Sequence, residues 1–246
     1  MKNKIIILFV LIILSFSYGA AVGRYEIFPF SNIQSLKKII VLDNDKKSIT
    51  IKDDEKNYRW LDRVSLFEKL NKTHDIVVFG DSIMERFEWT EYFKDVDIVN
   101  RGIAGDTSFL ILERLYNVVA TKPEKVFLMI GINDLNRGRS PETIFNNIVS
   151  IAEKLNDNGI KVIMQSVILL SEKYDLDHKV ADNKEILKLN ELIKEYCFEK
   201  KYIYVDHNEN LAYKGYLNND YTIDGFHLNG NGYFILAENL KKYIYQ

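Results

Sequence analysis

Ser82 is the first residue whose type and setting suggest chemistry. It ends the stretch Ile76-Val-Val-Phe-Gly-Asp-Ser82, in which four apolar residues are followed by glycine, aspartate and serine. This pattern is typical of a strand-to-helix turn, where glycine permits the bend and Asp or Ser caps the helix. The same turn can present a serine nucleophile for acyl transfer, which needs a general base and a third group that orients the base. Three residues leave both interpretations open, so the choice depends on a histidine partner.

Two of the chain's histidines are poor partners for Ser82. The sequence contains four histidines, which are His74, His178, His207 and His227. His74 precedes the strand pattern that leads to Ser82, which places it at the opposite rim of a sheet. His178 lies in a loop pattern of mixed charge, where a solvated side chain is the ordinary interpretation.

The other two histidines each have an aspartate nearby in the sequence. His207 directly follows Asp206, and adjacent side chains at a strand exit point apart. His227 has Asp224 three residues earlier, so that one carboxylate can reach the imidazole edge while the other ring nitrogen faces outward. A D-x-x-H spacing is common in structural roles, but here it favours Asp224 and His227 as the partners of Ser82.

Acyl transfer also needs hydrogen-bond donors for the oxyanion that develops on the substrate. Gly102 has no side chain, so its backbone N–H can approach a substrate oxygen closely. Asn133 offers a neutral side-chain amide that can donate without losing a proton. Each residue alone is typical of a turn or a cap, but both follow predicted strands, which favours an oxyanion hole.

The elements that must position these residues alternate between strands and helices. The β-rich runs are 75–79, 96–99, 125–130, 161–168 and 202–205. Between them lie amphipathic stretches, of which the clearest is the stripe Ile144, Ile148, Ile151 and Leu155, opened by Ser140-Pro141-Glu142 and closed by Gly159. Alternation of this kind predicts an α/β fold with a parallel sheet between two layers of helices. In such sheets the chemistry gathers beyond the carboxyl ends of the strands, where Ser82, Gly102 and Asn133 are expected.

Composition excludes several classes of function. The 246 residues are 47% hydrophobic, enough for one large domain, and 33 basic and 35 acidic residues nearly cancel. This balance gives no electrostatic signature of a nucleic-acid-binding protein. The single cysteine, Cys197, excludes an internal disulfide framework and is expected to be a buried small hydrophobe. No clustered His and Cys spacing suggests a metal site, and we expect no cofactor.

Four separated motifs resemble the signature blocks of the SGNH hydrolases, also called the GDSL esterase/lipase family. They are Gly80-Asp81-Ser82, Gly102, Gly131-x-Asn133-Asp134 and Asp224-x-x-His227, in that order. The resemblance covers about residues 60–246, and one departure is Ile83 where the family has leucine. It implies a flavodoxin-like three-layer α/β/α sandwich, here with a five-stranded parallel sheet.

The resemblance also implies a role for each motif residue. Ser82 would be the nucleophile, His227 the base and acid, and Asp224 the orienting carboxylate. The oxyanion hole would comprise the backbone N–H groups of Ser82 and Gly102 and the side chain of Asn133. The stretches Asn100–Thr107 and Asp224–Gly230 look most similar to the short-chain branch, which includes acetylhydrolases of the platelet-activating-factor type and carbohydrate O-acetylesterases. A serine esterase acting on short acyl esters of carbohydrates or lipids, most simply acetyl esters, is therefore expected.

The N-terminal region predicts export. Met1-Lys-Asn-Lys4 is basic, and residues 5–23 then form 19 uncharged residues before Arg24. This pattern indicates a signal peptide or an N-terminal membrane anchor at residues 1–23, so we expect an extracytoplasmic protein, either anchored or secreted after cleavage. Residues 24–59 form a lead-in with a possible hairpin at 38–51, and residues 60–246 the hydrolase domain.

Two rival functions share the same residues. An O-acyltransferase would use the same triad but pass the acyl group to a sugar hydroxyl instead of water. A non-catalytic glycan-binding scaffold would keep the fold but have no need of Ser82, Asp224, His227 and Asn133 together. The expected ligand is in each case a small-molecule or glycan acyl ester, with membrane association possible only through residues 5–23.

Overall fold

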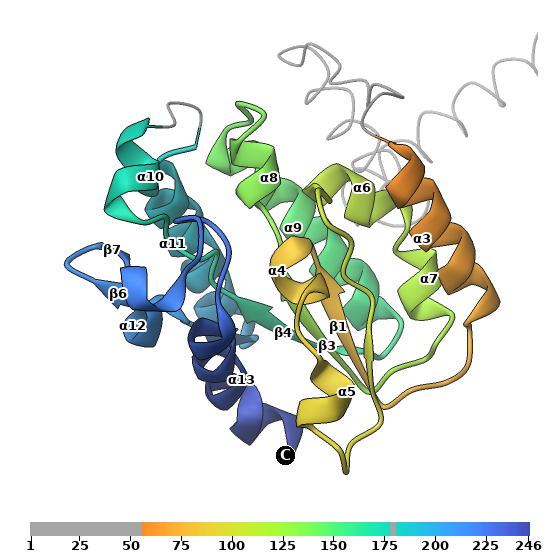
Figure 1. Ribbon diagram of the computed structural model, residues 1–246. Coiled ribbons are helices and arrows are strands. Elements are labelled where there is room, and N and C mark those ends of the chain that lie inside the picture. Colours follow the sequence, from red (N-terminus) through yellow and green to blue (C-terminus); the bar gives the residue numbers. More distant parts are fainter. Residues whose placement is uncertain (1–55, 178–180) are drawn as a thin grey trace, which may run out of the picture. The chain divides into compact units, whose positions relative to one another are not determined.

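Five parallel strands form the centre of the fold (Figure 1). The computed structural model describes residues 56–177 and 181–246. The strands are β1 (Ile76–Gly80), β2 (Ile98–Asn100), β3 (Lys125–Met129), β4 (Lys161–Gln165) and β5 (Ile203–Val205). Their order is β2-β1-β3-β4-β5, with every neighbouring pair parallel. The predicted three-layer α/β fold with a five-stranded parallel sheet is confirmed.

Helices surround the sheet and a small hairpin follows it. The longer helices are α3 (Tyr58–Lys69), α9 (Pro141–Asp157), α11 (Asn183–Lys200) and α13 (Gly230–Ile244). The shorter ones are α4 (Ser82–Glu85), α5 (Trp89–Tyr92), α6 (Ser108–Glu113), α7 (Tyr116–Val119), α8 (Ile132–Leu135), α10 (Glu172–Asp177) and α12 (Asn208–Leu211). The hairpin pairs β6 (Ala212–Tyr213) with β7 (Tyr216–Leu217), and a 3₁₀ turn covers Asn219–Tyr221.

Alternate residues of each strand enter two separate cores, one on each face of the sheet. On one face Val77 and Phe79 pack with buried residues of α6, α7, α9 and α11. On the other face Ile76 and Val78 pack with buried residues of α4, α5 and α13. Because both faces are covered, the strands are apolar throughout rather than alternating, as is usual for a parallel sheet.

The start and the end of helix α9 follow local sequence signals. Ser140 precedes the helix and its Oγ accepts a hydrogen bond from the N–H of Thr143, while Pro141 occupies the first helical position. Gly159, with φ of 76°, follows the helix end. These are the predicted start and stop signals.

Strand β4 is shorter than predicted. The apolar run continues to Ile168 in the sequence, but the strand ends at Gln165. Beyond it the backbone of Val167 exchanges two hydrogen bonds of 2.8 Å with the side chain of Asn190. Side-chain amides thus replace the sheet ladder, which is why a buried apolar segment here is not a strand.

Several predictions concern residues outside those that the structure describes. These are the segment at residues 1–23, the hairpin at 38–51 and the loop histidine His178. Within residues 56–177 and 181–246, no helix combines the length and apolar character needed to cross a membrane.

Candidate active site

Ser82, His227 and Asp224 form one hydrogen-bonded chain. The Ser82 Oγ lies 3.1 Å from His227 Nε2, and His227 Nδ1 lies 2.7 Å from Asp224 Oδ2. A carboxylate only accepts hydrogen bonds, so the proton of the neutral imidazole lies on Nδ1 and Nε2 is free to accept from the serine hydroxyl. The structure therefore brings together the three residues that the sequence predicted as partners, although 145 positions separate Ser82 from His227.

A tight loop holds Asp224 against His227. The Asp224 Oδ1 accepts the backbone N–H groups of Phe226, at 2.9 Å, and of His227, at 2.7 Å. Thr222 Oγ1 donates to the carbonyl of His227, which closes the loop. Burial acts to raise the pKa of Asp224, but the hydrogen bonds from His227 and Phe226 outweigh it and hold that pKa below its usual value. The carboxylate thus stays charged and orients the ring.

Ser82 is the first residue of α4, immediately after β1. Asp81 caps this helix by accepting the N–H of Ile83 at 3.0 Å. Gly80 is still part of β1, and a Cβ built there would lie 2.2 Å from the carbonyl oxygen of Met129. We expected Gly80 to allow a bend, but glycine is required because strand β3 passes too close for a side chain.

Asp81 is a buried carboxyl group next to Ser82 in the sequence. Burial raises its pKa to about 7, the N–H of Ile83 opposes this, and the carboxylates of Asp106 and Asp134 add to the rise. Much of this side chain is therefore protonated near neutral pH, which is unusual for an aspartate.

The two predicted oxyanion donors differ in whether they have a hydrogen left to donate to a substrate. Asn133 Nδ2 donates one hydrogen to the carbonyl of Asp106 at 2.9 Å, which leaves the second amide hydrogen for a substrate oxygen. The N–H of Gly102 donates to Asn100 Oδ1 at 2.8 Å. A substrate oxygen would therefore have to share this hydrogen with Asn100. The N–H of Ser82 lies in the first turn of α4, where no intrahelical acceptor exists.

Asn100 is a site residue that our sequence reasoning missed. Besides accepting from Gly102, its Nδ2 donates to the carbonyls of Met84 and Glu85 at 3.0 and 2.9 Å. It thereby clamps the loop after β2 to the helix that begins with Ser82. A Cβ at Gly102 would lie 2.5 Å from the backbone nitrogen of Glu85, so this close contact explains the glycine. The only sequence signal was the position of Asn100 at a strand exit.

A buried network of charged groups lies next to the site. Asp106 pairs with Arg114 and accepts the indole N–H of Trp60 at 2.9 Å. Asp134 accepts the N–H and the hydroxyl of Ser108 at 2.8 and 2.9 Å, which ties α8 to α6. The carbonyl of Asp106 accepts from Asn133 Nδ2, so the network holds the side chain that was predicted as an oxyanion donor. Asp134 belongs to a motif named from the sequence, but its contact with Ser108 spans 26 positions and that of Asp106 with Trp60 spans 46, so the network itself had no local pattern.

The remaining single-residue predictions have clear outcomes. His207 is fully buried, its Nε2 lies 2.9 Å from Gln165 Oε1, and burial lowers its pKa to about 3. It is thus a neutral core residue apart from the Ser82 chain. His74 pairs with Asp97, which precedes β2.

Cys197 is buried, and burial raises its pKa to about 12, as expected for an inert thiol. Within the described residues, no group of three or more His, Cys, Asp or Glu side chains could hold a metal ion.

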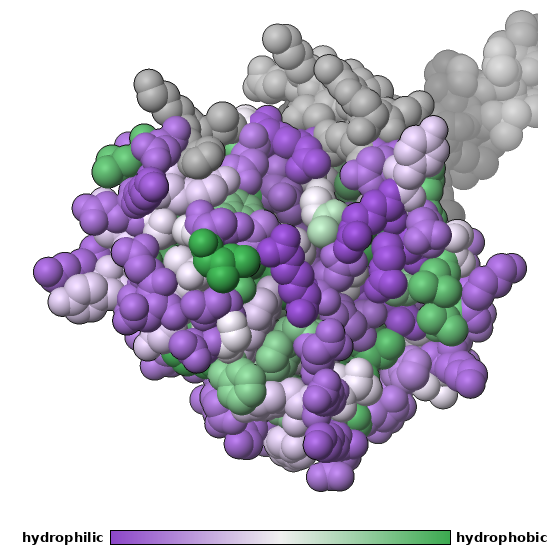
Figure 2. Space-filling model, in the orientation of Figure 1, coloured by the Kyte–Doolittle hydropathy of each residue, from purple (hydrophilic) through white to green (hydrophobic). Residues whose placement is uncertain are grey.

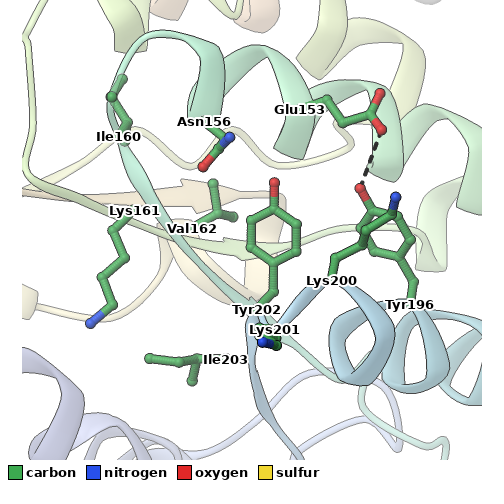
Figure 3. Close-up of a pocket in the computed structure, with 11 residues that line it drawn as sticks. Glu153, Asn156, Ile160, Lys161, Val162, Tyr196, Lys200, Lys201, Tyr202 and Ile203 are labelled. Atoms are coloured by element: carbon green, nitrogen blue, oxygen red, sulfur yellow. Dashed lines mark hydrogen bonds between the residues drawn. The ribbon is translucent and has the colours of Figure 1, made fainter.

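A further pocket lies at the other end of the sheet. Its volume is about 550 Å³, and the residues that line it come from the starts of β4 and β5 and from α9 and α11 (Figure 3). Tyr202, Lys161 and Lys200 are among them. Because the triad residues lie beyond the opposite ends of the parallel strands, this pocket has no part in chemistry at Ser82.

Comparisons with known proteins agree with the geometry. The family model described as GDSL-like lipase/acylhydrolase matches residues 78–235. A GDSL-like lipase from Bacteroides thetaiotaomicron is 31% identical with a TM-score of 0.63, and the match covers 72% of this chain and 89% of that one. The N-acylneuraminate cytidylyltransferase of Streptococcus agalactiae is 29% identical over 157 residues, which are 64% of this chain and 35% of that protein. Human platelet-activating factor acetylhydrolase IB subunit alpha2 is 29% identical over 143 residues, 54% of this chain and 62% of that protein.

These matches, together with the fold, define the class of protein. The chain belongs to the GDSL-like lipase/acylhydrolase family. It spans only 35% of the length of the streptococcal cytidylyltransferase that it matches.

Proposed function

We propose that the protein hydrolyses short acyl esters, above all acetyl esters, of carbohydrates or lipids, with Ser82, His227 and Asp224 as its catalytic triad. The observation that carries the proposal is the chain of two hydrogen bonds, 3.1 Å from Ser82 Oγ to His227 Nε2 and 2.7 Å from His227 Nδ1 to Asp224 Oδ2. It has the arrangement of nucleophile, base and orienting acid that acyl transfer requires.

The reaction follows from this arrangement. The Ser82 Oγ attacks the ester carbonyl while His227 takes the hydroxyl proton, and the carbonyl oxygen becomes an oxyanion. Asn133 and the N–H groups of Ser82 and Gly102 stabilise that charge, with Gly102 sharing its hydrogen with Asn100. His227 then gives the proton to the departing alcohol, which leaves an acyl-serine. Water, deprotonated by His227, releases the acid and restores Ser82.

A small, mostly apolar pocket lined by the two residues that flank Ser82, Asp81 and Ile83, supports a short acyl group. Its volume is about 10 Å³, and Ile83, Ile132 and Phe226 contribute to its wall. A cavity of about 10–15 Å³ holds roughly one water-sized group. An acetyl methyl would fit this space, whereas a longer acyl chain would displace buried side chains.

The relatives favour hydrolysis and a glycan substrate. One of them is named as an acetylhydrolase, and others are named for an N-acylneuraminate, which is an acidic sugar. Cytidylyl transfer is not inferred, because the match covers only 35% of that enzyme.

A kinetic series tests the proposal on the full chain. The 4-nitrophenyl esters of acetate, butyrate and octanoate would be compared for the native protein and for Ser82→Ala. We expect kcat/KM to fall steeply with chain length, and Ser82→Ala to lose activity by a factor on the order of a million in kcat. A properly folded Ser82→Ala protein that retained more than a tenth of the turnover would refute the triad. Acyl transfer to added sugar in preference to water would instead identify an O-acyltransferase.

We also propose that residues 1–23 direct export, so that the enzyme meets acylated envelope glycans or lipids. The support is the basic start followed by 19 uncharged residues. Cell fractionation with N-terminal sequencing tests this, and full-length protein in the soluble cytosol would contradict it.

A further inference from the structure

A groove with aromatic walls lies beside the nucleophile's helix. It runs between α5 and the first turn of α13, which lie side by side (Figure 1). We call it the α5–α13 groove and define it by Arg86, Phe87, Glu91, Tyr92, Tyr233 and Phe234. Its volume of about 520 Å³ lies within the range of ordinary ligand sites.

The groove adjoins the helix that begins with Ser82. Arg86 caps the helix that Ser82 begins, and its N–H donates to the Ser82 carbonyl at 3.2 Å. Four residues of helix rise only about 6 Å, so the groove begins close to the nucleophile. Burial raises the pKa of Tyr233, Arg86 opposes this, and Asp81 and Asp224 add to the rise.

The ring arrangement leaves one aromatic side chain at the surface of the groove. Phe87 stacks on Tyr233 with centroids 5.5 Å apart and an interplanar angle of 16°. Phe234 contacts Tyr92 edge to face at 5.2 Å, and 58% of Phe234 remains exposed. A hydrogen bond of 2.6 Å from the Tyr92 hydroxyl to Glu238 holds that ring in place. The Phe234 ring is therefore exposed to solvent, while the Tyr92 ring that it contacts is held in place.

The surroundings of the rings are charged. Arg86, Glu88, Glu91 and Lys94 all line the groove and all are exposed. Figure 2 shows the same side of the molecule as mostly hydrophilic, with apolar atoms in small separate patches. An alkyl chain could contact the rings but would form no hydrogen bond with these charged groups. A sugar ring offers an apolar C–H face to the aromatic rings and hydroxyl groups to the charged side chains.

We propose that the α5–α13 groove binds the sugar ring of the substrate, so that the enzyme acts on acylated carbohydrates rather than on acylated lipids. The proposal rests on the proposed esterase function of Ser82. The acyl group would occupy the small pocket beside Ser82, and the sugar that leaves as the alcohol would stack on Phe234.

Kinetics with two acetyl esters test the groove in the full chain. One ester is 6-O-acetylglucose and the other is 4-nitrophenyl acetate, which carries no sugar. We expect Phe234→Ala to lower the ratio of kcat/KM for the sugar ester over the phenyl ester about tenfold, the size of one lost aromatic stacking contact. Phe234→Tyr keeps the ring and should keep the ratio within about twofold.

The matched control is Phe198→Ala, which removes an 87% exposed phenylalanine from α11, outside the groove. It should leave the ratio unchanged. A ratio unaltered in Phe234→Ala, or lowered equally in Phe198→Ala, would overturn the proposal. So would a Phe234→Ala defect confined to hexadecyl acetate in detergent micelles, because that result would identify a lipid groove.

Binding can be measured without catalysis. Saturation-transfer NMR of methyl glucoside with Ser82→Ala should give a signal that disappears in the Ser82→Ala, Phe234→Ala double variant. If Ser82→Ala still hydrolysed both esters, the triad proposal would fail, while this NMR comparison would still decide the groove. Equal signals in the single and double variants would overturn the sugar site.

Discussion

Asn133 owes its orientation to a single backbone contact. Its amide donates to the carbonyl of Asp106, and that carbonyl lies in a loop whose carboxylate pairs with the buried Arg114. This hydrogen bond fixes one amide hydrogen of Asn133 and thereby sets the direction in which the second amide hydrogen points. This preorganisation makes a donor effective, because no reorganisation is needed when the oxyanion forms.

We therefore expect Asn133→Ala to lower kcat about a hundred- to a thousandfold with little change in KM, since the lost hydrogen bond matters mainly in the transition state. Steady-state kinetics on 4-nitrophenyl acetate measures both constants. Asn136→Ala, on a half-buried asparagine just after α8, serves as the matched control. A variant with raised KM and native kcat would assign Asn133 to ground-state binding instead.

Residue patterns predicted some parts of the site and not others. Asp224 and His227 lie three positions apart, so their contact depends on one local loop and a sequence motif reveals it. Asn100 acts on carbonyls of Met84 and Glu85, which reach it only through the pairing of β2 with β1. Such a contact has no local signature, and for this reason it was missed.

At the scale of elements, the segment after β4 depends on asparagine side chains. Asn190 of α11 satisfies both the N–H and the carbonyl of Val167, and Asn183 does the same for Leu170. The two N–H groups would otherwise lack partners, whereas each carbonyl has a second donor, which is Asn208 Nδ2 at Val167 and the N–H of Leu217 at Leu170. The segment links β4 to the wall of the small apolar pocket, so the asparagines help shape that pocket.

Asn190→Ala should lower the free energy of unfolding by about 1–3 kcal/mol, because it leaves the buried N–H of Val167 without a partner and one unsatisfied buried polar group costs roughly that much. Urea denaturation measures the change. Glu191→Ala, an exposed neighbour on the same helix, should cost less than about 0.5 kcal/mol. Equal destabilisation by the two substitutions would show that the hydrogen bonds to Val167 contribute nothing specific.

The five strands could be predicted because each combines an apolar run with a turn signal. The end of β4 could not, since Val167 and Ile168 continue the apolar run while the backbone of Val167 bonds to Asn190 of α11 and Asn208 of α12. The hairpin of β6 and β7 was also missed, because its strands have two residues each and show no alternation. Lys214 and Gly215 make its turn with φ of 53° and 84°.

At the scale of the whole molecule, buried titratable groups link stability to pH. Asp81 has its pKa raised to about 7 in the folded protein, against 3.8 as the ordinary value. Between these pH values the unfolded chain is ionised while the folded chain keeps its proton. The folded state therefore loses stability as pH rises from about 4 to about 7, by up to about 1.4 kcal/mol per pH unit. His207 acts in the opposite direction, because its lowered pKa removes stability as pH falls below about 6.5 towards 3.

Asp81→Asn isolates the contribution of Asp81, since an asparagine oxygen can still cap the N–H of Ile83 and His207 is common to both proteins. We expect the stability of the variant relative to the native protein to increase between pH 4 and pH 7 and to level off above pH 7. Urea denaturation at a series of pH values gives this difference directly. A difference that does not vary with pH would mean that Asp81 is ionised throughout.

The central claim is that Ser82 is a nucleophile activated by His227, and covalent labelling tests it most directly. A fluorophosphonate reacts with a serine only when its hydroxyl is activated, so intact mass and peptide mapping locate that serine. We predict one adduct per chain, on Ser82, formed at least a hundredfold more slowly in His227→Ala and absent in Ser82→Ala. Labelling of another residue, or an unchanged rate in His227→Ala, would contradict the account.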